Sequence, residues 1–523
     1  MNDTAATGSI PKSEFIYDEV PYPILTFSQT HPDLLATMGR FYGMKAADPT
    51  KCRVLEIGCG SGANLLFMAY TLPQSEFVGI DLSAVQIDDA KKAAEELAIP
   101  NVKFLQQDIT ESNPDALGKF DYIVAHGVYS WVPEPVRRSM LKLYSQCLDD
   151  DGIGFISFNA YPGSHLRQMV WEPIRFHVKN MSPWDRQIEE GRKFLAGLTN
   201  SMGWHPTLQS IIRDELKEII KKPSQFVLHD ELSETNQPFY FHEFIEQSKE
   251  WGLRFLAEAD PKWLNTGNLP AGVQDFLKGM GADVERREQY LDLIRWGRFR
   301  RILLCRDNID LVREMDAGRM KQFLVASQAK QGSETGDINS AEPKKFTMPD
   351  DSWFDINHPL TKAAFVCLEA RWPKRIAFDD LIDEASKMLD ARSQENIPAE
   401  IEATAKCLVE LSLTGIIKLH SYQPDFADKA GEYPRANRFV QWQSRAGAVS
   451  VSTLTEPMLE PNDEVTGYLL PLLDGTRNRK DLIEEIKKIA HIKPEEKEEF
   501  DAALPAKVET ALQVIAEAGL LIG

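Results

Sequence analysis

The sequence predicts an α/β protein: a seven-stranded, doubly wound sheet with a helical insertion, followed by mainly helical C-terminal units. Three observations lead to this fold class. Apolar runs of strand length alternate with amphipathic helical segments through residues 52–159, which is typical of a parallel sheet covered by helices on both faces. The alternation resumes at 238–306, after a stretch that reads as helical. Beyond a polar segment, the helices of residues 351–523 form two similar units.

The elements of the sheet domain, expected at residues 15–310, follow from the apolar pattern. Strands are predicted at 52–58, 76–81, 101–108, 120–127, 152–159, 253–259 and 299–306. Helices are predicted at 62–72, 83–98, 134–148, 238–252 and 289–297. Right-handed crossovers between parallel strands make such a sheet doubly wound. Residues 160–225 contain no clear strand, so we interpret them as a helical insertion.

The C-terminal third is expected to begin after a linker at residues 326–350, which are polar and contain few apolar side chains. Two units follow, at 351–425 and 455–523. Each runs through helical segments to a glycine and a short apolar strand, "GIIKLHSY" in the first and "GLLIG" in the second. This weak internal repeat has the size of winged-helix domains.

The length and charge of the chain bound its domains and partners. With 523 residues, the chain is long enough for about three or four domains. Its formal net charge of -20 disfavours nucleic acid as a partner and is suited either to a basic protein partner or simply to solubility. The sequence predicts no particular oligomeric state.

The cysteines and the amino terminus bear on metal binding and location. None of the 6 cysteines forms a CxxC pair, and no His/Cys cluster has zinc spacing, so no metal site is expected. The first residues lack the pattern of a secretion signal, and no window is apolar enough to span a membrane. We therefore expect a cytoplasmic protein without membrane insertion.

A glycine-rich segment, "LEIGCGSG" at 55–62, lies between the first predicted strand and the first predicted helix. Its glycines allow the backbone to approach a ligand closely. Glu56 lies at the end of the first strand, Asp81 ends the second and Asp108 ends the third. Because the carboxyl ends of parallel strands open on the same crevice, these three carboxyl groups are expected to lie around one ligand.

The charge of Glu56 indicates which ligand this crevice takes. The GxGxxG spacing of dinucleotide sites is met only approximately, because residue 63 is alanine. A pyrophosphate would also be repelled by Glu56. S-adenosylmethionine carries a sulfonium and an ammonium group, and both would be attracted by that carboxylate. The alternative is that Glu56 and Asp81 only cap helices.

The segment resembles the "(D/E)xGxGxG" motif of class I S-adenosylmethionine-dependent methyltransferases, a Rossmann-like fold, and the likeness covers roughly residues 15–306. The resemblance implies that Asp81 holds the ribose hydroxyls, Asp108 accepts from the adenine amino group and the last strand runs in reverse. The cofactor-binding residues that it implies are Glu56, Gly58, Cys59, Gly60, Asp81, Leu82, Asp108, Ile109, His126 and Gly127.

A narrower likeness rests on five further segments. They are "YDEVPYPILTFSQTHP" (17–32), "AHGVYSWVP" (125–133), "FNAYPG" (158–163), "VLHDEL" (227–232) and "NQPFYFHEF" (236–244). Together they are similar to a bacterial group with a methyltransferase regulatory domain, which would cover about 220–306 here. The group includes rickettsial-type protein-lysine methyltransferases that act on outer-membrane proteins, and its members have a winged-helix-like C-terminal region.

Four residues are candidates for steering or accepting the acceptor's proton: Tyr129, Tyr161, His126 and His229. Methyl transfer is an SN2 displacement that needs in-line approach and a dry site more than a strong base. The alternatives are packing under the following helix for Tyr129, a solvated turn for His229 and a structural hydrogen bond for His126. "QTHP" at 29–32 is expected either to form a lid or to start a helix.

These observations favour an enzyme that methylates accessible lysines of a protein substrate, with outer-membrane proteins among the acceptors that the resemblance suggests. A small-molecule methyltransferase is the nearest alternative, and its closed pocket would be walled by the 160–225 insertion. A DNA-binding winged-helix regulator is less favoured, because the helix at 379–387 is acidic and recognition helices usually carry Arg, Lys, Asn or Gln.

Overall fold

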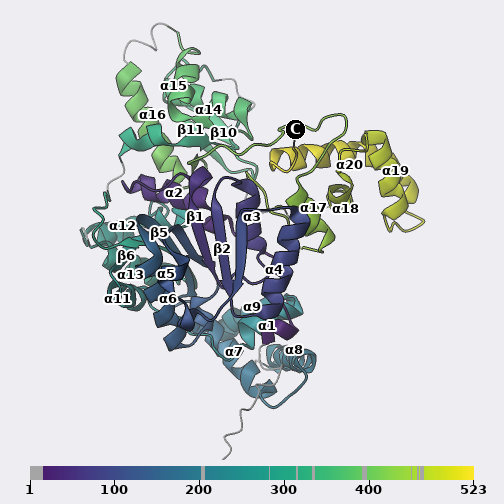
Figure 1. Ribbon diagram of the computed structural model, residues 1–523. Coiled ribbons are helices and arrows are strands. Elements are labelled where there is room, and N and C mark those ends of the chain that lie inside the picture. The colour runs from purple at the N-terminus through teal and green to yellow at the C-terminus, as the bar shows by residue number, and fades with distance from the viewer. Residues whose placement is uncertain are drawn as a thin grey trace, which may run out of the picture.

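The computed structural model describes residues 16–201, 206–281, 283–313, 316–332, 336–390, 397–448, 450–455, 459 and 464–522. Figure 1 shows a central sheet with helices on both faces, a helical lobe below it and two further lobes above and beside it. Within the described residues, no helix combines the length and apolar character needed to cross a bilayer.

The central sheet has seven strands in the order β3-β2-β1-β4-β5-β7-β6. They are β1 (Arg53–Ile57), β2 (Glu76–Asp81), β3 (Val102–Gln106), β4 (Phe120–Ala125), β5 (Leu148–Asn159), β6 (Leu253–Glu258) and β7 (Phe299–Arg306). Strand β7 pairs antiparallel with β5 and β6, whereas β1 to β5 pair in parallel. The predicted fold class and the reversed last strand are both confirmed.

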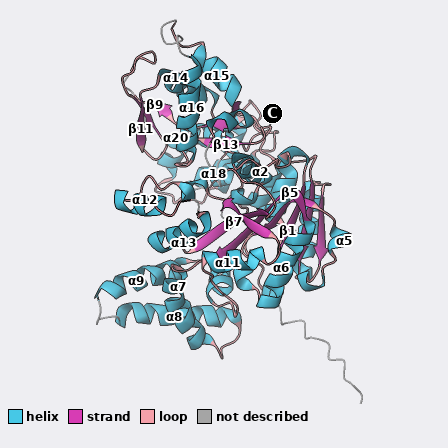
Figure 2. Ribbon diagram, turned by 90° about the vertical axis from the view of Figure 1, so that its left-hand side faces the viewer, coloured by secondary structure: helices cyan, strands magenta, loops and turns pink. Residues whose placement is uncertain are grey.

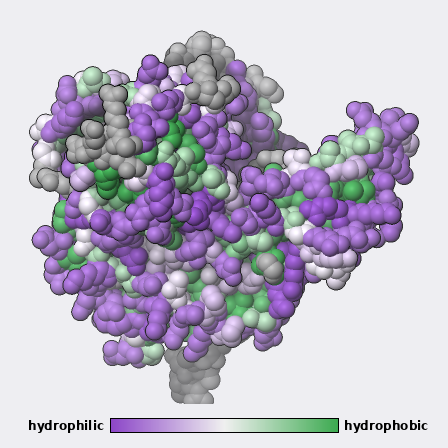
Figure 3. All heavy atoms as spheres, turned by 90° about the horizontal axis from the view of Figure 1, so that it is seen from above, coloured by the Kyte–Doolittle hydropathy of each residue, from purple (hydrophilic) through white to green (hydrophobic). Residues whose placement is uncertain are grey.

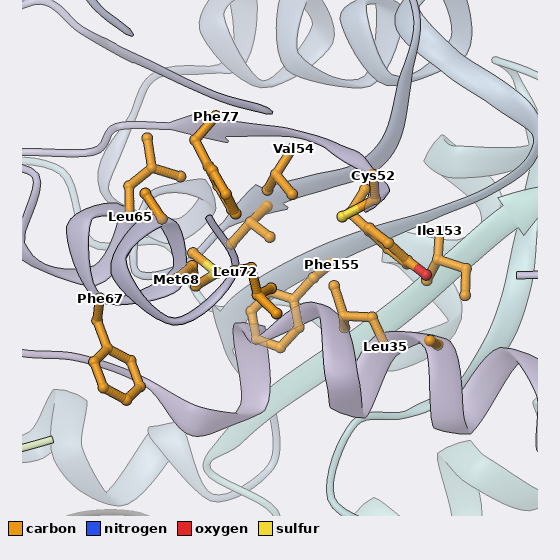
Figure 4. Packing of buried hydrophobic residues seen from close by; sticks show 14 of the residues in the cluster. Leu35, Cys52, Val54, Leu65, Phe67, Met68, Leu72, Phe77, Ile153 and Phe155 are labelled. Atoms are coloured by element: carbon orange, nitrogen blue, oxygen red, sulfur yellow. The ribbon is translucent and has the colours of Figure 1, made fainter. Parts of the chain in front are cut away.

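Helices cover both faces of this sheet because its strands are apolar on both sides. On one face lie α2 (Pro32–Phe41), α3 (Ala63–Thr71) and α4 (Ala84–Leu97), and on the other lie α6 (Glu134–Cys147) and α11 (Phe241–Lys249), with α13 (Val284–Arg295) beside α11. Figure 4 shows the first core, in which Leu35 of α2 and Leu65 and Met68 of α3 point toward strand residues. Alternate strand residues serve the two cores: Val54 faces the first and Leu55 the second.

The region predicted as a helical insertion is helical. It contains α7 (Ser164–Val178), α8 (Trp184–Ser201), α9 (Pro206–Lys221) and α10 (Ser224–Phe226), followed by the π-helical turn η5 (Val227–Glu231). These helices bury a core of their own, and Val20 from the start of the described chain packs into it. Figure 2 shows the lobe beneath the sheet. Two short helices, α5 (Pro114–Leu117) and α12 (Ala271–Lys278), complete the sheet domain.

The first C-terminal unit begins earlier in the chain than expected. It contains η7 (Ala317–Gln322), β8 (Leu324–Ala326), β9 (Lys330–Gln331), β10 (Lys344–Thr347), β11 (Trp353–Ile356), α14 (Pro359–Arg371), β12 (Ile376–Ala377), α15 (Phe378–Ser386), α16 (Ile397–Ser412) and β13 (Lys418–His420). Strand β8 pairs with β12 and β13. The expected linker at 326–350 therefore holds paired strands, because the fully buried Phe346 anchors its polar sequence against Phe354 and Phe365.

The second C-terminal unit contains α17 (Arg438–Arg445), α18 (Glu464–Leu469), η8 (Leu470–Leu472), α19 (Arg479–Ile489) and α20 (Lys497–Glu517). The short strand expected at the end of the chain appears as two bridges, from Leu521 to Ala427 and to Ala436. Seen from above, part of this unit projects from the body of the molecule, and its surface is mostly hydrophilic (Figure 3).

A buried polar network joins the C-terminal units to the sheet domain. Asp33 of α2 accepts hydrogen bonds from Arg375 Nη1 at 3.0 Å, His420 Nδ1 at 2.7 Å and the Ser421 amide at 2.6 Å. Tyr422 completes the contact by packing into the core under α2. These contacts place the C-terminal units against the same helix that begins at the rim of the crevice.

Candidate functional site

The glycine-rich loop between β1 and α3 has a backbone that only glycine adopts easily. Gly58, Gly60 and Gly62 have φ values of 69°, 53° and 77°, in the left-handed region that penalises other residues. A Cβ on Gly58 would lie 2.6 Å from Val128 Cγ2. The Gly58 and Cys59 amides both donate to the Ile80 carbonyl, at 2.8 and 3.2 Å. The loop is thereby held against β2, as a close approach to a ligand requires.

Asp81, at the end of β2, is bound to this loop. Its carboxylate accepts from the Gly60 amide and the Ser83 amide, both at 2.9 Å. Burial nevertheless raises the pKa of Asp81 above its usual range. Leu82 follows and is 49% exposed, which leaves an apolar side chain open beside the carboxylate. An acid with an exposed apolar neighbour suits a ribose and its base.

Asp108, at the end of β3, caps the short 3-10 helix η3 (Ile109–Glu111). Its Oδ1 accepts from the Thr110 amide and hydroxyl, both at 2.8 Å. The position expected for Asp108 and Ile109 at the carboxyl edge of the sheet is therefore observed. The observed bonds show that Asp108 also stabilises its own turn.

Glu56 is a buried carboxyl group with one oxygen left over. It is 4% exposed, and its Oε1 accepts from Asn64 Nδ2 at 2.7 Å. Its Oε2 is buried and has no hydrogen-bond partner in the described structure. Burial raises the pKa of Glu56 to about 8, although the bond from Asn64 opposes the shift. An orphaned buried carboxyl oxygen fits the ammonium or sulfonium group of S-adenosylmethionine.

His126, at the end of β4, contributes an aromatic surface to the crevice. Its ring stacks on Phe27 with centroids 3.7 Å apart and planes 17° apart. Burial, and then the charge of Arg301, lowers the pKa of His126 to about 3, so the ring is neutral at physiological pH. The adjacent Gly127 is exposed, and a Cβ added to it would meet no atom within 4 Å. The crevice is open at this point.

Tyr129 lies elsewhere than expected. It is fully buried, and its hydroxyl donates to Gln247 Oε1 on α11 at 2.7 Å. Its ring packs against Phe239 and Phe244. Tyr129 was expected among the residues that steer or accept the acceptor's proton, but the 3-10 turn after β4 directs its ring into the core, which was the alternative for this residue.

Tyr161 and His229 lie on two different segments at the acceptor side. Tyr161 follows β5, is partly exposed and stacks on His165 with centroids 4.2 Å apart. His229, on η5, is 2% exposed and stacks on Tyr17 at 4.4 Å. Its Nε2 lies 2.8 Å from the Val20 carbonyl, so Nε2 carries the proton. Burial lowers the pKa of His229, and its place in a buried turn excludes the solvated-turn alternative.

Residues 16–31, which we call the strap, cross the rim of the crevice. The strap starts with α1 (Ile16–Glu19) and ends with η1 (Ser28–Thr30). Asp18 accepts from the Ser83 hydroxyl at 2.5 Å, beside Asp81, and Phe27 covers His126. Of the two expectations for 29–32, a lid or a helix start, the structure shows the helix start, because His31 is the N-cap of α2 and accepts from the Asp33 amide. The covering residues lie earlier in the chain.

Three residues of this site, Tyr17, Phe27 and Asn64, were missed in the sequence. The aromatic residues before "QTHP" were a signal for the first two. Asn64 is the second residue of α3, two positions beyond the motif, and a polar side chain in an otherwise apolar helix could have drawn attention to it. Within the described residues, no group of three or more His, Cys, Asp or Glu side chains could hold a metal ion.

Comparisons with known proteins agree with this geometry. A family model described as "Methyltransferase domain" matches residues 54–152, "Predicted methyltransferase regulatory domain" matches 223–306 and "PKMT, C-terminal winged helix domain" matches 432–520. The uncharacterized protein RP789 of Rickettsia prowazekii is 30% identical over 477 residues, which cover 90% of this chain and 85% of that protein.

The structure of PKMT2 from Rickettsia typhi in complex with AdoHcy is similar over nearly the whole chain. It superposes with a TM-score of 0.83 at 28% identity and covers 96% of this chain and 100% of that one. AdoHcy is the product that remains when S-adenosylmethionine has lost its methyl group. The chain is an S-adenosylmethionine-dependent methyltransferase, and it belongs to the rickettsial-type family that joins a methyltransferase domain to a methyltransferase regulatory domain and a PKMT C-terminal winged-helix domain.

Proposed function

We propose that this methyltransferase methylates lysine side chains of a protein substrate. The observation that carries the proposal is the likeness to PKMT2, a rickettsial protein-lysine methyltransferase, over 96% of the chain. The match of the PKMT winged-helix model at 432–520 supports it independently of the sheet domain. The family resemblance favours outer-membrane proteins as the acceptor class.

The proposed cofactor site uses the carboxyl edge of β1 to β4. Glu56 and the backbone of Gly58, Cys59 and Gly60 would hold the methionine part. Asp81 would hold the ribose hydroxyls, Leu82 would lie against the adenine, and Asp108 with the Ile109 amide would meet its amino group. His126 and Gly127 would lie beside the sulfonium. The orphaned Glu56 Oε2 and the exposed Leu82 support these roles.

The proposed acceptor side would prepare an amine for attack. A free lysine has a pKa near 10.4, so removing the proton from its ammonium group at pH 7 costs about 4.6 kcal/mol. A dry site and the adjacent sulfonium lower that pKa. Tyr161 and His229 would orient the amine or pass its proton to water. A neutral His229 with its proton on Nε2 keeps a lone pair on Nδ1, as that role requires.

Acidic and aromatic groups beside these residues suit a cationic side chain. Tyr22 donates to Asp230 Oδ1 at 3.5 Å, and its ring is tilted against His229 with centroids 5.6 Å apart. Aromatic faces attract ammonium groups by about 0.5–2 kcal/mol each. The aromatic faces favour a cationic acceptor over a neutral one, whereas Asp230 already pairs with Lys222 Nζ at 3.6 Å.

The C-terminal units are proposed to position the acceptor protein. A cavity of about 560 Å³ lies between the sheet domain and these units. Its walls come from the strap and α2, from the loop after β6 at 259–264, and from residues 412–420 and 453–455. A polypeptide entering between the two parts would therefore touch both of them next to the strap.

The test is a labelling experiment with the full-length enzyme. Radiolabelled S-adenosylmethionine is incubated with the enzyme and a lysate of the source organism, and labelled fractions are analysed by mass spectrometry. The Asp81→Ala variant serves as the blank. Label on a protein, mapped to lysine, is the expected result. Label confined to small molecules, or to protein side chains other than lysine, would overturn the proposal.

A further inference from the structure

Asn64 joins the cofactor motif to the strap through a single amide group. It is 6% exposed. Its Nδ2 donates to Glu56 Oε1 at 2.7 Å and to Thr30 Oγ1 at 3.0 Å. Its Oδ1 accepts from the Phe27 amide at 2.8 Å. One side chain thus contacts β1 on one side and two strap residues on the other.

The chemistry of these contacts requires an amide at position 64. The Phe27 backbone N–H can only donate, so it fixes Oδ1 on the strap side. Nδ2 then faces Glu56, which can only accept in the ionised form that would hold the cofactor. An aspartate would keep the acceptor for Phe27 and lose the donor for Glu56. A leucine of similar size would lose both.

The two groups that Asn64 holds lie near the ends of two directly paired strands, β1 and β4. Glu56 presents its orphaned Oε2 at the end of β1. Phe27 covers His126 at the end of β4, with ring centroids 3.7 Å apart. If either group moves, the geometry of the Asn64 amide changes, and the hydrogen bond from Asn64 to the other group changes with it.

We infer that Asn64 is a positioning residue that couples the hold of Glu56 on the cationic cofactor to closure of the strap over the crevice. The inference rests on the role proposed above for Glu56. It adds that the strap closes over the crevice when Glu56 holds the cofactor. The strap also reaches the C-terminal region one residue before Phe27, where Thr26 Oγ1 and Ser452 Oγ are 2.6 Å apart. The covered state is therefore fixed from both sides.

The charges around Glu56 give this coupling a measurable signature. The titratable groups that face it are Asp81, Cys59 and Tyr144, all of which are acids. Burial raises its pKa to about 8, so in the empty crevice at pH 7 the carboxyl group is mostly protonated. A bound ammonium favours the carboxylate, so binding releases up to about one proton at pH 7. Affinity then rises with pH until about pH 8.

The experiment measures AdoHcy binding to the full-length enzyme by calorimetry at pH 7 in two buffers of different ionisation enthalpy. Chymotrypsin cleavage at Phe27, with and without AdoHcy, reports closure of the strap. We expect Asn64→Leu to bind AdoHcy about 10- to 100-fold more weakly, the loss typical of a charge-assisted hydrogen bond. We also expect AdoHcy to lose its protection of Phe27 in this variant.

Two variants separate positioning from folding. Asn101→Leu removes a comparable amide, which donates to the Ala69, Leu72 and Ser75 carbonyls beyond the far end of α3. It should lower the melting temperature and leave AdoHcy affinity, proton release and protection unchanged. Asn64→Asp should keep the protection of Phe27 and still weaken AdoHcy binding. This variant replaces Asn64→Leu in the test if Asn64→Leu does not fold.

The outcomes also distinguish this inference from the role proposed for Glu56. Glu56→Gln should bind AdoHcy more weakly and release no proton; wild-type affinity and proton release in that variant would refute the role of Glu56 itself. If Glu56→Gln binds weakly while Asn64→Leu keeps wild-type affinity and protection, the coupling alone is refuted. Equal effects of Asn64→Leu and Asn101→Leu would also refute it.

Discussion

The proposed cofactor half and the proposed acceptor half of the crevice are built by different means. The proposed cofactor half, at the ends of β1 to β4, depends mainly on backbone geometry: three left-handed glycines and an aspartate that accepts from the Gly60 amide. The acceptor half depends on side chains from distant segments, such as His229 and Val20, which are 209 positions apart. A backbone site tolerates few substitutions, whereas a site assembled from side chains can change its acceptor while the fold stays intact.

The largest expected effect is on the glycine loop. A Cβ at Gly62 would lie 2.6 Å from Phe104 Cζ, and its φ is 77°. Overpacking and left-handed strain together predict that Gly62→Val lowers the free energy of unfolding by about 2–4 kcal/mol and abolishes AdoHcy binding. Chemical denaturation and calorimetry measure both.

Gly127→Ala, at the end of β4, is the control for backbone strain without overpacking. Its φ is also positive, at 68°, but a Cβ there meets no atom within 4 Å. We expect only the backbone cost, about 1 kcal/mol. If both glycine variants lose the same stability, crowding against Phe104 is not what destabilises Gly62→Val.

The next effect concerns Asp81. Asp81→Ala removes the proposed acceptor for the ribose hydroxyls together with the bonds to Gly60 and Ser83. We expect AdoHcy to bind about 10- to 100-fold more weakly. Wild-type affinity in calorimetry would remove Asp81 from the cofactor site. Asp108→Ala, whose observed bonds are to its own turn, should have the smaller effect.

The proposed acceptor half would also depend on docking of the C-terminal units. The buried contact between these units and α2 is expected to depend on pH. Burial lowers the pKa values of His31 and His420 to about 4 in the folded protein, below the ordinary value of about 6.5 in the unfolded chain. Between these values the unfolded chain binds more protons, so stability falls as pH falls from 6.5 toward 4.

The size of this effect between pH 7 and pH 5 is on the order of 2 kcal/mol for each histidine, and so about 4 kcal/mol for the two. Asp33 does not contribute in this window, because Arg375 and His420 hold its pKa below the usual range and it stays ionised. Thermal unfolding at the two pH values tests the expectation. In His420→Gln the loss should be smaller; an unchanged loss would assign the pH dependence to other groups.

How much of the molecule could be predicted from its sequence follows the same division between the two halves. The positions of the seven strands along the chain, Asp81 at the end of the second strand and the glycine loop were predictable, because local apolar runs and a local motif determine them. Tyr129 could not be placed, because its partner Gln247 lies 118 positions away. The polar segment at 326–350 was read as a linker, because one buried side chain, Phe346, contributes little to its average composition.

The smallest effects separate a catalytic role from a packing role for three of the candidate residues, Tyr129, Tyr161 and His229. Tyr161→Phe and His229→Gln should each lower kcat/KM for the protein acceptor about tenfold and leave AdoHcy affinity unchanged. This loss is smaller than the roughly 10²–10⁴-fold of a general base, because water takes the proton. Tyr129→Phe loses only the hydrogen bond to Gln247. It should cost about 1 kcal/mol of stability with kcat/KM unaltered. Because Tyr161→Phe also loses one hydroxyl bond, to Gln168, the two tyrosine variants are matched in chemistry and differ in place. Equal loss of activity in both would mean that packing of the aromatic core, and not the crevice, sets the rate. The proposed acceptor site would then have to be placed next to α11 instead.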